Sequence, residues 1–146
     1  MEIEFKLYLE PVPHQSVRAI PKIGQNGKPY NMFHQPNKII KYRKNVRNLV
    51  MEQLPKNFEP FEKDIPLIME VVYYFKYRKT EKKSLIGEMI PKVTSGDVHD
   101  NLNKALCDSL QGIVFQQDQQ IFDFHAKKYW YKGNGIYIKI STFNKG

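Results

Sequence analysis

Residues 97–121 have the sequence DVHDNLNKALCDSLQGIVFQQDQQI, and this stretch predicts a helix, a stop and the start of a strand. On a helix from 98 to 111, placing residues every 100° gives one apolar face that would pack on a core. That face consists of Leu102, Ala105, Leu106, Ser109 and Leu110. Gly112 suits the position just beyond a helix C-terminus. The apolar, aromatic segment from Ile121 onward then predicts a strand.

The rest of the chain alternates strand and helix signals around this stretch. Residues 2–9 alternate apolar and polar side chains, which is typical of a half-buried strand. A helix is predicted at 38–54, where Pro55 closes it. Further strands are predicted at 66–77, 121–130 and 135–143. The order β-α-β-α-β-β predicts an α+β fold, a single domain over residues 1–146 with a small mixed sheet packed against two main helices.

One long polar loop interrupts this pattern between residues 14 and 36. It contains Asn26-Gly27, the dipeptide that favours a two-residue hairpin turn. A small two-stranded ribbon inside the loop is therefore expected.

Composition restricts the class of protein. Lys and Arg number 23 against 15 Asp and Glu, which gives a formal net charge of +8 and suggests a polyanionic partner such as nucleic acid. Cys107 is the only cysteine, which excludes a disulfide within the chain and a cysteine-based zinc site. No segment is long and apolar enough for a membrane span, and the first residues do not resemble a signal peptide. A soluble protein of the cytoplasm is expected.

Four aspartates lie within 22 residues of this basic chain, at positions 97, 100, 108 and 118. On the predicted helix, Asp100, Lys104 and Asp108 are spaced i, i+4, i+8 on the polar face, with Asn101 beside them. One interpretation is a solvated face, with Asp97 as a helix cap and Asp118 as an ordinary turn residue. The alternative is that three of these carboxylates converge.

If Asp97, Asp100 and Asp118 converge, they form an oxygen-only site of the kind that Mg²⁺ prefers. Such a site can orient water for attack on phosphorus and stabilise the leaving 3′ oxygen. Lys104 would neutralise charge that develops on the phosphate.

Three linked blocks within these residues resemble the RusA family of Holliday junction resolvases, the crossover junction endodeoxyribonucleases. The blocks are Asp100-Asn-Leu-x-Lys104, Asp108-Ser-Leu-x-Gly112 and Asp118-Gln-Gln-Ile121. The resemblance implies a Mg²⁺-dependent endonuclease, with Mn²⁺ as a substitute, that acts as a homodimer and resolves four-way, branched DNA by paired nicks in recombination and repair. It also implies that Asp100 and Asp118 bind metal, that Lys104 is catalytic, and that a phage or prophage origin is reasonable.

The chain departs from the family pattern at two places. The family separates its first two aspartates by one residue, whereas Val98 and His99 separate Asp97 from Asp100. Either Asp97 supplies the displaced metal-binding and catalytic carboxylate, or His99 acts there as a ligand or general base. The second departure is Gln117, which stands where the family usually has an aspartate. Residues His99, Asn101 and Asp108 are expected to shape the site.

A set of cations in the loop and around the first helix is predicted to follow DNA phosphates, although a solvated basic face is the plainer interpretation of any one of them. The set comprises Arg18, Lys22, Lys28, Lys38, Lys41, Arg43 and Lys44, with Arg47 nearby. Phosphate contacts give affinity without sequence information, which suits an enzyme that recognises shape. The alternative function is a branched-DNA-binding protein of the same fold without catalytic activity.

Overall fold

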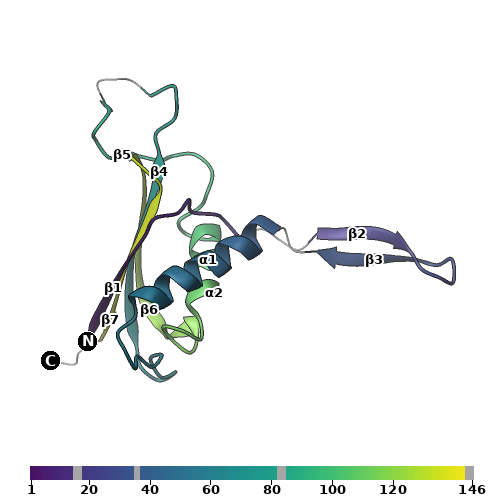
Figure 1. The fold of residues 1–146 in the computed structure, drawn as a ribbon, viewed down its shortest axis with the longest axis horizontal. Coiled ribbons are helices and arrows are strands. Elements are labelled where there is room, and N and C mark those ends of the chain that lie inside the picture. Colours follow the sequence, from purple (N-terminus) through teal and green to yellow (C-terminus); the bar gives the residue numbers. More distant parts are fainter. Residues whose placement is uncertain (15–17, 35–36, 82–84, 144–146) are drawn as a thin grey trace.

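A mixed five-stranded sheet forms one layer of the protein (Figure 1). The computed structural model describes residues 1–14, 18–34, 37–81 and 85–143. The sheet comprises β1 (Glu2–Leu7), β7 (Gly135–Thr142), β4 (Leu67–Lys76), β6 (Ile121–Tyr131) and β5 (Ile90–Pro91), in that spatial order. β4 and β6 are parallel, and the other neighbouring strands are antiparallel.

Alternation along the strands decides which face of the sheet is buried. On β1, Ile3, Phe5 and Leu7 are buried while the residues between them are exposed. β4 and β7 follow the same rule, and their inward side chains end in the core: Leu67, Met69, Val71, Tyr73, Ile136, Ile138 and Ile140. Because side chains alternate between faces, the polar positions of these strands lie together on the opposite face.

Two helices, α1 (Asn37–Gln53) and α2 (Asn101–Leu110), cover the buried face of the sheet (Figure 1). The buried side chains of α1 are Ile39, Tyr42, Val46 and Val50, which recur at helical spacing. The Gln53 side chain then bonds both to the backbone N–H of Lys6, at 3.0 Å, and to its carbonyl, at 2.9 Å. This contact ties the end of α1 to the edge strand β1.

Helix α2 begins three residues later than the sequence pattern predicted. The carbonyl oxygen of Asp97 accepts bonds from the backbone N–H groups of Asp100 (3.4 Å) and Leu102 (3.0 Å), so this stretch forms a turn. Asp100 has a non-helical backbone, with φ −145° and ψ −91°. The predicted core face is confirmed, because all five of its side chains are buried. The pattern placed the apolar face correctly but could not show where the turn ends.

A two-stranded ribbon, β2 (Arg18–Ile23) paired with β3 (Pro29–His34), extends away from the rest of the protein (Figure 1). Its tip turns through Gly27, which has φ +74°, a conformation that favours glycine. The ribbon expected from Asn26-Gly27 is therefore present. The ends of the long loop, at 15–17 and 35–36, lie outside the described residues.

Strand β5 was not predicted. It contributes only two residues, paired with Trp130 and Tyr129 of β6, and such a short edge strand has no periodic pattern. The architecture is α+β, with two helices on a mixed sheet and a small second sheet, as the sequence predicted. None of the helices within the described ranges is both long and apolar enough to cross a membrane.

Candidate active site on helix α2

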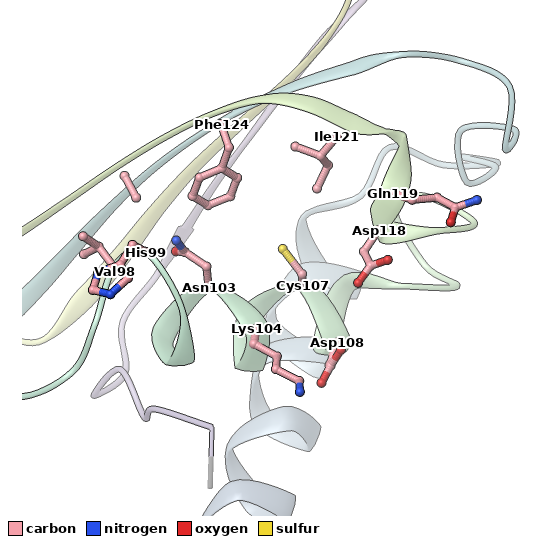
Figure 2. A pocket seen from close by; sticks show the side chains of 11 residues that line it. Val98, His99, Asn103, Lys104, Cys107, Asp108, Asp118, Gln119, Ile121 and Phe124 are labelled. Atoms are coloured by element: carbon pink, nitrogen blue, oxygen red, sulfur yellow. The ribbon is translucent and has the colours of Figure 1, made fainter. Parts of the chain in front are cut away.

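A cavity of about 730 Å³ lies where α2, the short 3₁₀ helix η2 (Asp118–Gln120) and the start of β6 meet (Figure 2). Its polar lining consists of His99, Asn103, Lys104, Cys107, Asp108, Asp118 and Gln119. Its apolar lining consists of Val98, Ile121, Phe124 and Ala126. The cavity combines an apolar base on β6 with polar groups from α2 and η2.

The position of Asp118 depends on a tight reversal and a buried amide. Gly112, at φ +90°, turns the chain after α2, and its N–H bonds the carbonyl of Phe115 at 2.7 Å. Two residues beyond Asp118, the buried Gln120 side chain donates to three backbone carbonyls. These belong to Phe61 (3.3 Å), Glu62 (2.6 Å) and Ile65 (3.2 Å). The anchored glutamine holds η2 in place, so the backbone that carries the exposed Asp118 side chain is fixed.

Four side chains of α2, those of Asn103, Lys104, Cys107 and Asp108, form the opposite wall. Lys104 is exposed, and its amino group points toward the same side of the cavity as the Asp108 and Asp118 carboxylates (Figure 2). The Oδ1 of Asn103 accepts a 2.7 Å bond from the hydroxyl of Tyr73, a buried residue of β4. This bond fixes the orientation of the Asn103 amide from within the core.

Cys107 lies close enough to Asp118 and Asp108 for both charges to affect it. Burial, followed by the nearby charges of Asp118 and Asp108, raises the pKa of the Cys107 thiol to about 12. The thiol therefore stays neutral at physiological pH. It forms part of the cavity wall and carries no charge there.

A brace behind the cavity connects α2 to the N-terminal segment and to α1. The Arg43 guanidinium lies 3.2 Å from the Asp108 carboxylate and 3.1 Å from Nδ1 of His14. The backbone N–H of His14 bonds the carbonyl of Asn101 at 2.8 Å. Burial, together with the charges of Lys104 and Arg43, lowers the pKa of His14, so its ring is neutral at pH 7.

This brace gives two predicted phosphate-binding arginines a structural partner. Arg43 contacts Asp108, and Arg47 donates to the carbonyls of Ser109 and Gln111 at 3.2 Å each, at the end of α2. Neither contact could be predicted from the sequence, because the partners are more than 60 residues apart. The role of His14 was missed for the same reason, since no ligand-like spacing marks it.

The structure brings only part of the predicted set together. His99, Lys104, Asp108 and Asp118 line the cavity, whereas Asp97 and Asp100 are exposed at the turn before α2 and do not line it. Asn101 shapes this turn, because its Oδ1 accepts a 2.6 Å bond from the Asp97 N–H.

The expected convergence of Asp97, Asp100 and Asp118 is not found. Asp118 lies beside the Cys107–Asp108 turn of the helix, at the opposite end of the cavity from His99 (Figure 2). Within the described residues, no three His, Cys, Asp or Glu side chains form a group that could hold an ion. The physical reason is the late helix start, which leaves Asp97 and Asp100 in the turn before α2, outside the lining of the cavity.

The predicted DNA-binding cations lie on two consecutive elements. Lys22 and Lys28 are exposed on the ribbon, and Lys38, Lys41 and Lys44 are exposed on α1. Arg18 begins β2. The ribbon and the exposed side of α1 thus carry positive charge next to each other along the chain.

Comparison with known proteins gives one family. The family model described as Endodeoxyribonuclease RusA matches residues 9–141 of the 146-residue chain. No curated protein matches the chain.

Proposed function

Because the chain belongs to the RusA family of endodeoxyribonucleases, we propose that it resolves four-way DNA junctions by a pair of Mg²⁺-dependent nicks. The family itself identifies the chain as an endodeoxyribonuclease of the Holliday junction resolvase type. The metal, the paired nicks and the site residues are our proposal. The observation that carries the proposal is that one cavity is lined by Lys104, Asp108, Asp118 and His99 together.

Lys104 and Asp118 are proposed as the catalytic pair. Lys104 is an exposed ammonium group on the cavity wall, so it can contact a non-bridging phosphate oxygen and offset the charge that develops during cleavage. The Asp118 carboxylate is exposed, and no hydrogen bond or ion pair to it occurs within the described part of the chain. Among the residues that the structure describes, the Asp118 carboxylate therefore makes no contact that stabilises the fold, and the Gln120 anchor fixes its backbone. Such a carboxylate is suited to binding a ligand.

The donor chemistry of the cavity fits Mg²⁺. This ion usually takes one or two protein carboxylates and completes its shell with water and substrate phosphate. Asp118 supplies one such oxygen donor. Asp100, with Asp97, is proposed to supply others after the turn before α2 moves toward η2 when metal and DNA bind. When bound, Mg²⁺ would orient a water molecule and stabilise the leaving 3′ oxygen; Mn²⁺ is expected to replace it.

The remaining predicted residues have supporting roles in this proposal. His99 lines the cavity, so it is better placed than Asp97 to hold or accept a proton from attacking water. Asp108, tied to Arg43, sets the position of the α2 wall. Asn101 holds the turn that presents Asp100.

Substrate contacts are proposed along the ribbon and α1. Lys22 and Lys28 on the ribbon, with Lys38, Lys41 and Lys44 on α1, offer exposed phosphate contacts without any base-reading arrangement. Arg18 is included from its place in β2. A homodimer would supply the two active sites that paired nicks need. We place the activity in recombination and repair in the bacterial cytoplasm, with a phage or prophage as the source.

The test compares a synthetic mobile four-way junction with linear duplex, each with Mg²⁺ or with EDTA. Symmetric nicks that require Mg²⁺ and spare the duplex support the proposal. Tight junction binding without cleavage in Mg²⁺ or Mn²⁺ would instead support the inactive binding protein. Cleavage of linear duplex at the same rate would contradict junction selectivity.

A further inference from the structure

A second cavity, about 400 Å³ in volume, lies next to the candidate active site. It is lined by Glu10, Pro11, Pro13, Lys38, Phe75, Lys76, Lys92, Ser95, Gly96, Trp130 and Asn134. Its volume falls within the range of about 300–1,000 Å³ that is usual for ligand sites. Three of the lining residues are lysines and one is a glutamate, so the lining is positively charged.

The two cavities share one loop. Ser95 and Gly96 line the second cavity, and Val98 and His99 line the candidate active site. Since two consecutive residues extend the chain by at most about 7 Å, the two cavities lie side by side. Asp118 lies just before β6, whereas Trp130 lies near the other end of that strand, roughly 30 Å further along it. A DNA strand with one phosphate beside Asp118 would therefore reach the second cavity several nucleotides further on.

Lysines hold this shared loop in place. The Lys128 ammonium donates to the carbonyls of Thr94 and Gly96, at 2.6 Å each. The Lys92 ammonium donates to the carbonyl of Ser95. The wall between the two cavities is thus fixed by cations, which are the groups that also attract a phosphate.

At the buried end of the second cavity, two cationic side chains lie close together over aromatic rings. Lys92 is only 7% exposed, and its ammonium lies 4.6 Å from the ring centre of Phe75 and 5.0 Å from that of Trp130. Arg78 lies 4.9 Å from the same Trp130 ring and pairs with Glu81 at 2.5 Å. Burial, followed by the charges of Lys128 and Arg78, lowers the pKa of Lys92. A bound anion would relieve this repulsion.

We infer that this second cavity binds a nucleotide of the cleaved strand several positions from the scissile phosphate, with its phosphate among Lys38, Lys76 and Lys92. Its sugar and base pack against the apolar wall that Pro11, Pro13 and Trp130 form. This inference rests on the proposed nuclease function for the identity of the strand. The occupant is a single nucleotide of DNA, because the volume is small and the charge is positive.

The chain contains a built-in reporter for this site. Trp130 is the only tryptophan, so intrinsic tryptophan fluorescence comes from the cavity wall alone. The probe is a tetrathymidylate oligonucleotide, titrated in EDTA so that it is not cleaved. We expect saturable quenching of Trp130 fluorescence, with an affinity that falls as salt concentration rises.

The variant Lys38→Gln with Lys76→Gln removes the two rim charges. For single strands, the plot of log affinity against log salt has a slope of about −0.7 per phosphate contact. Because both lysines are proposed to contact the same phosphate, their loss should make this slope shallower by at most about 0.7 and weaken binding at low salt by roughly 10-fold. The matched control is Lys127→Gln with Lys139→Gln, which removes two charges from the opposite face of the sheet and should leave the slope unchanged.

The outcomes separate this site from the proposed function. Junction cleavage with no change in Trp130 fluorescence, or with the same salt slope in both double variants, would overturn the nucleotide site and leave the nuclease standing. Quenching that depends on Lys38 and Lys76 without any cleavage would keep the site and overturn the nuclease. Circular dichroism of each variant confirms that it folds before binding is compared.

Discussion

The Arg43 guanidinium lies 3.2 Å from the Asp108 carboxylate, and this contact joins the two helices behind the candidate active site. Both side chains are only partly exposed, at 24% and 33%. The sequence pattern assigned Arg43 to phosphate binding, so the two roles predict different effects of one substitution.

We predict that Arg43→Gln lowers the free energy of unfolding by about 1 kcal/mol, since it removes a partly screened ion pair and the contact with His14. Urea unfolding followed by circular dichroism measures this change. Lys44→Gln, on the exposed side of the same helix, is the control and should change stability by less than about 0.5 kcal/mol. Unchanged stability with weaker junction binding would show that Arg43 contacts DNA instead.

Asp118→Asn should abolish junction nicking while leaving the fold intact. The substitution removes one negative charge from an exposed side chain without changing its shape, and we expect a loss of at least about 100-fold in the nicking rate. Lys104→Ala and Asp100→Asn should have effects of similar size. Rates on a labelled four-way junction in Mg²⁺ provide the measurement, and Asp64→Asn, at an exposed turn residue that does not line the cavity, provides the control. Full activity of Asp118→Asn would remove this residue from the site.

Asp97→Asn and His99→Ala decide which residue takes the displaced position in the family pattern. His99 lines the cavity and Asp97 does not, so we expect His99→Ala to lose more nicking activity, by roughly 10-fold or more. The two variants are compared on the same junction across pH 6 to 9. If Asp97→Asn is the inactive one, the turn before α2 must rearrange when metal and DNA bind.

Much of the fold could be predicted from local sequence patterns, whereas less of the candidate site could. The apolar face of α2 and the alternation of β1 are periodic, so the core could be predicted from sequence. The ribbon could also be predicted, because the dipeptide Asn26-Gly27 favours a hairpin turn. The turn at Asp97 could not be predicted. It is held by a hydrogen bond from the Asp97 N–H to the Asn101 side chain, and such a bond leaves no periodic pattern in the sequence. The contacts of Arg43 with Asp108 and of Tyr73 with Asn103 join distant segments, and only the folded chain brings them together.

Cys107 should react slowly with alkylating reagents despite lining a cavity. Its pKa is raised from 9.0 to about 12, so the reactive thiolate is scarce at pH 8.5. The stabilising effect of the neutral thiol is fully present below pH 9 and is lost as the pH rises toward 12, because the unfolded chain ionises first. We expect the folded protein to react with iodoacetamide roughly 100-fold more slowly than the urea-unfolded protein, as measured by mass spectrometry. Equal rates would show that the thiol is exposed and ionises normally.

Gln120→Leu should destabilise the loop that positions Asp118 and reduce nicking with it. The Gln120 amide donates to the carbonyls of Phe61, Glu62 and Ile65, and removing it leaves these buried acceptors without their donor. We expect a loss of about 1–3 kcal/mol in unfolding free energy. Gln119→Leu, on the exposed side of η2, is the control for the unfolding measurement alone, because Gln119 lines the cavity, and it should change stability little. The test combines urea unfolding with nicking rates at a temperature where both variants are folded. Reduced nicking by the folded Gln120→Leu protein would show that the anchor positions Asp118, whereas normal nicking with reduced stability would limit Gln120 to a role in folding.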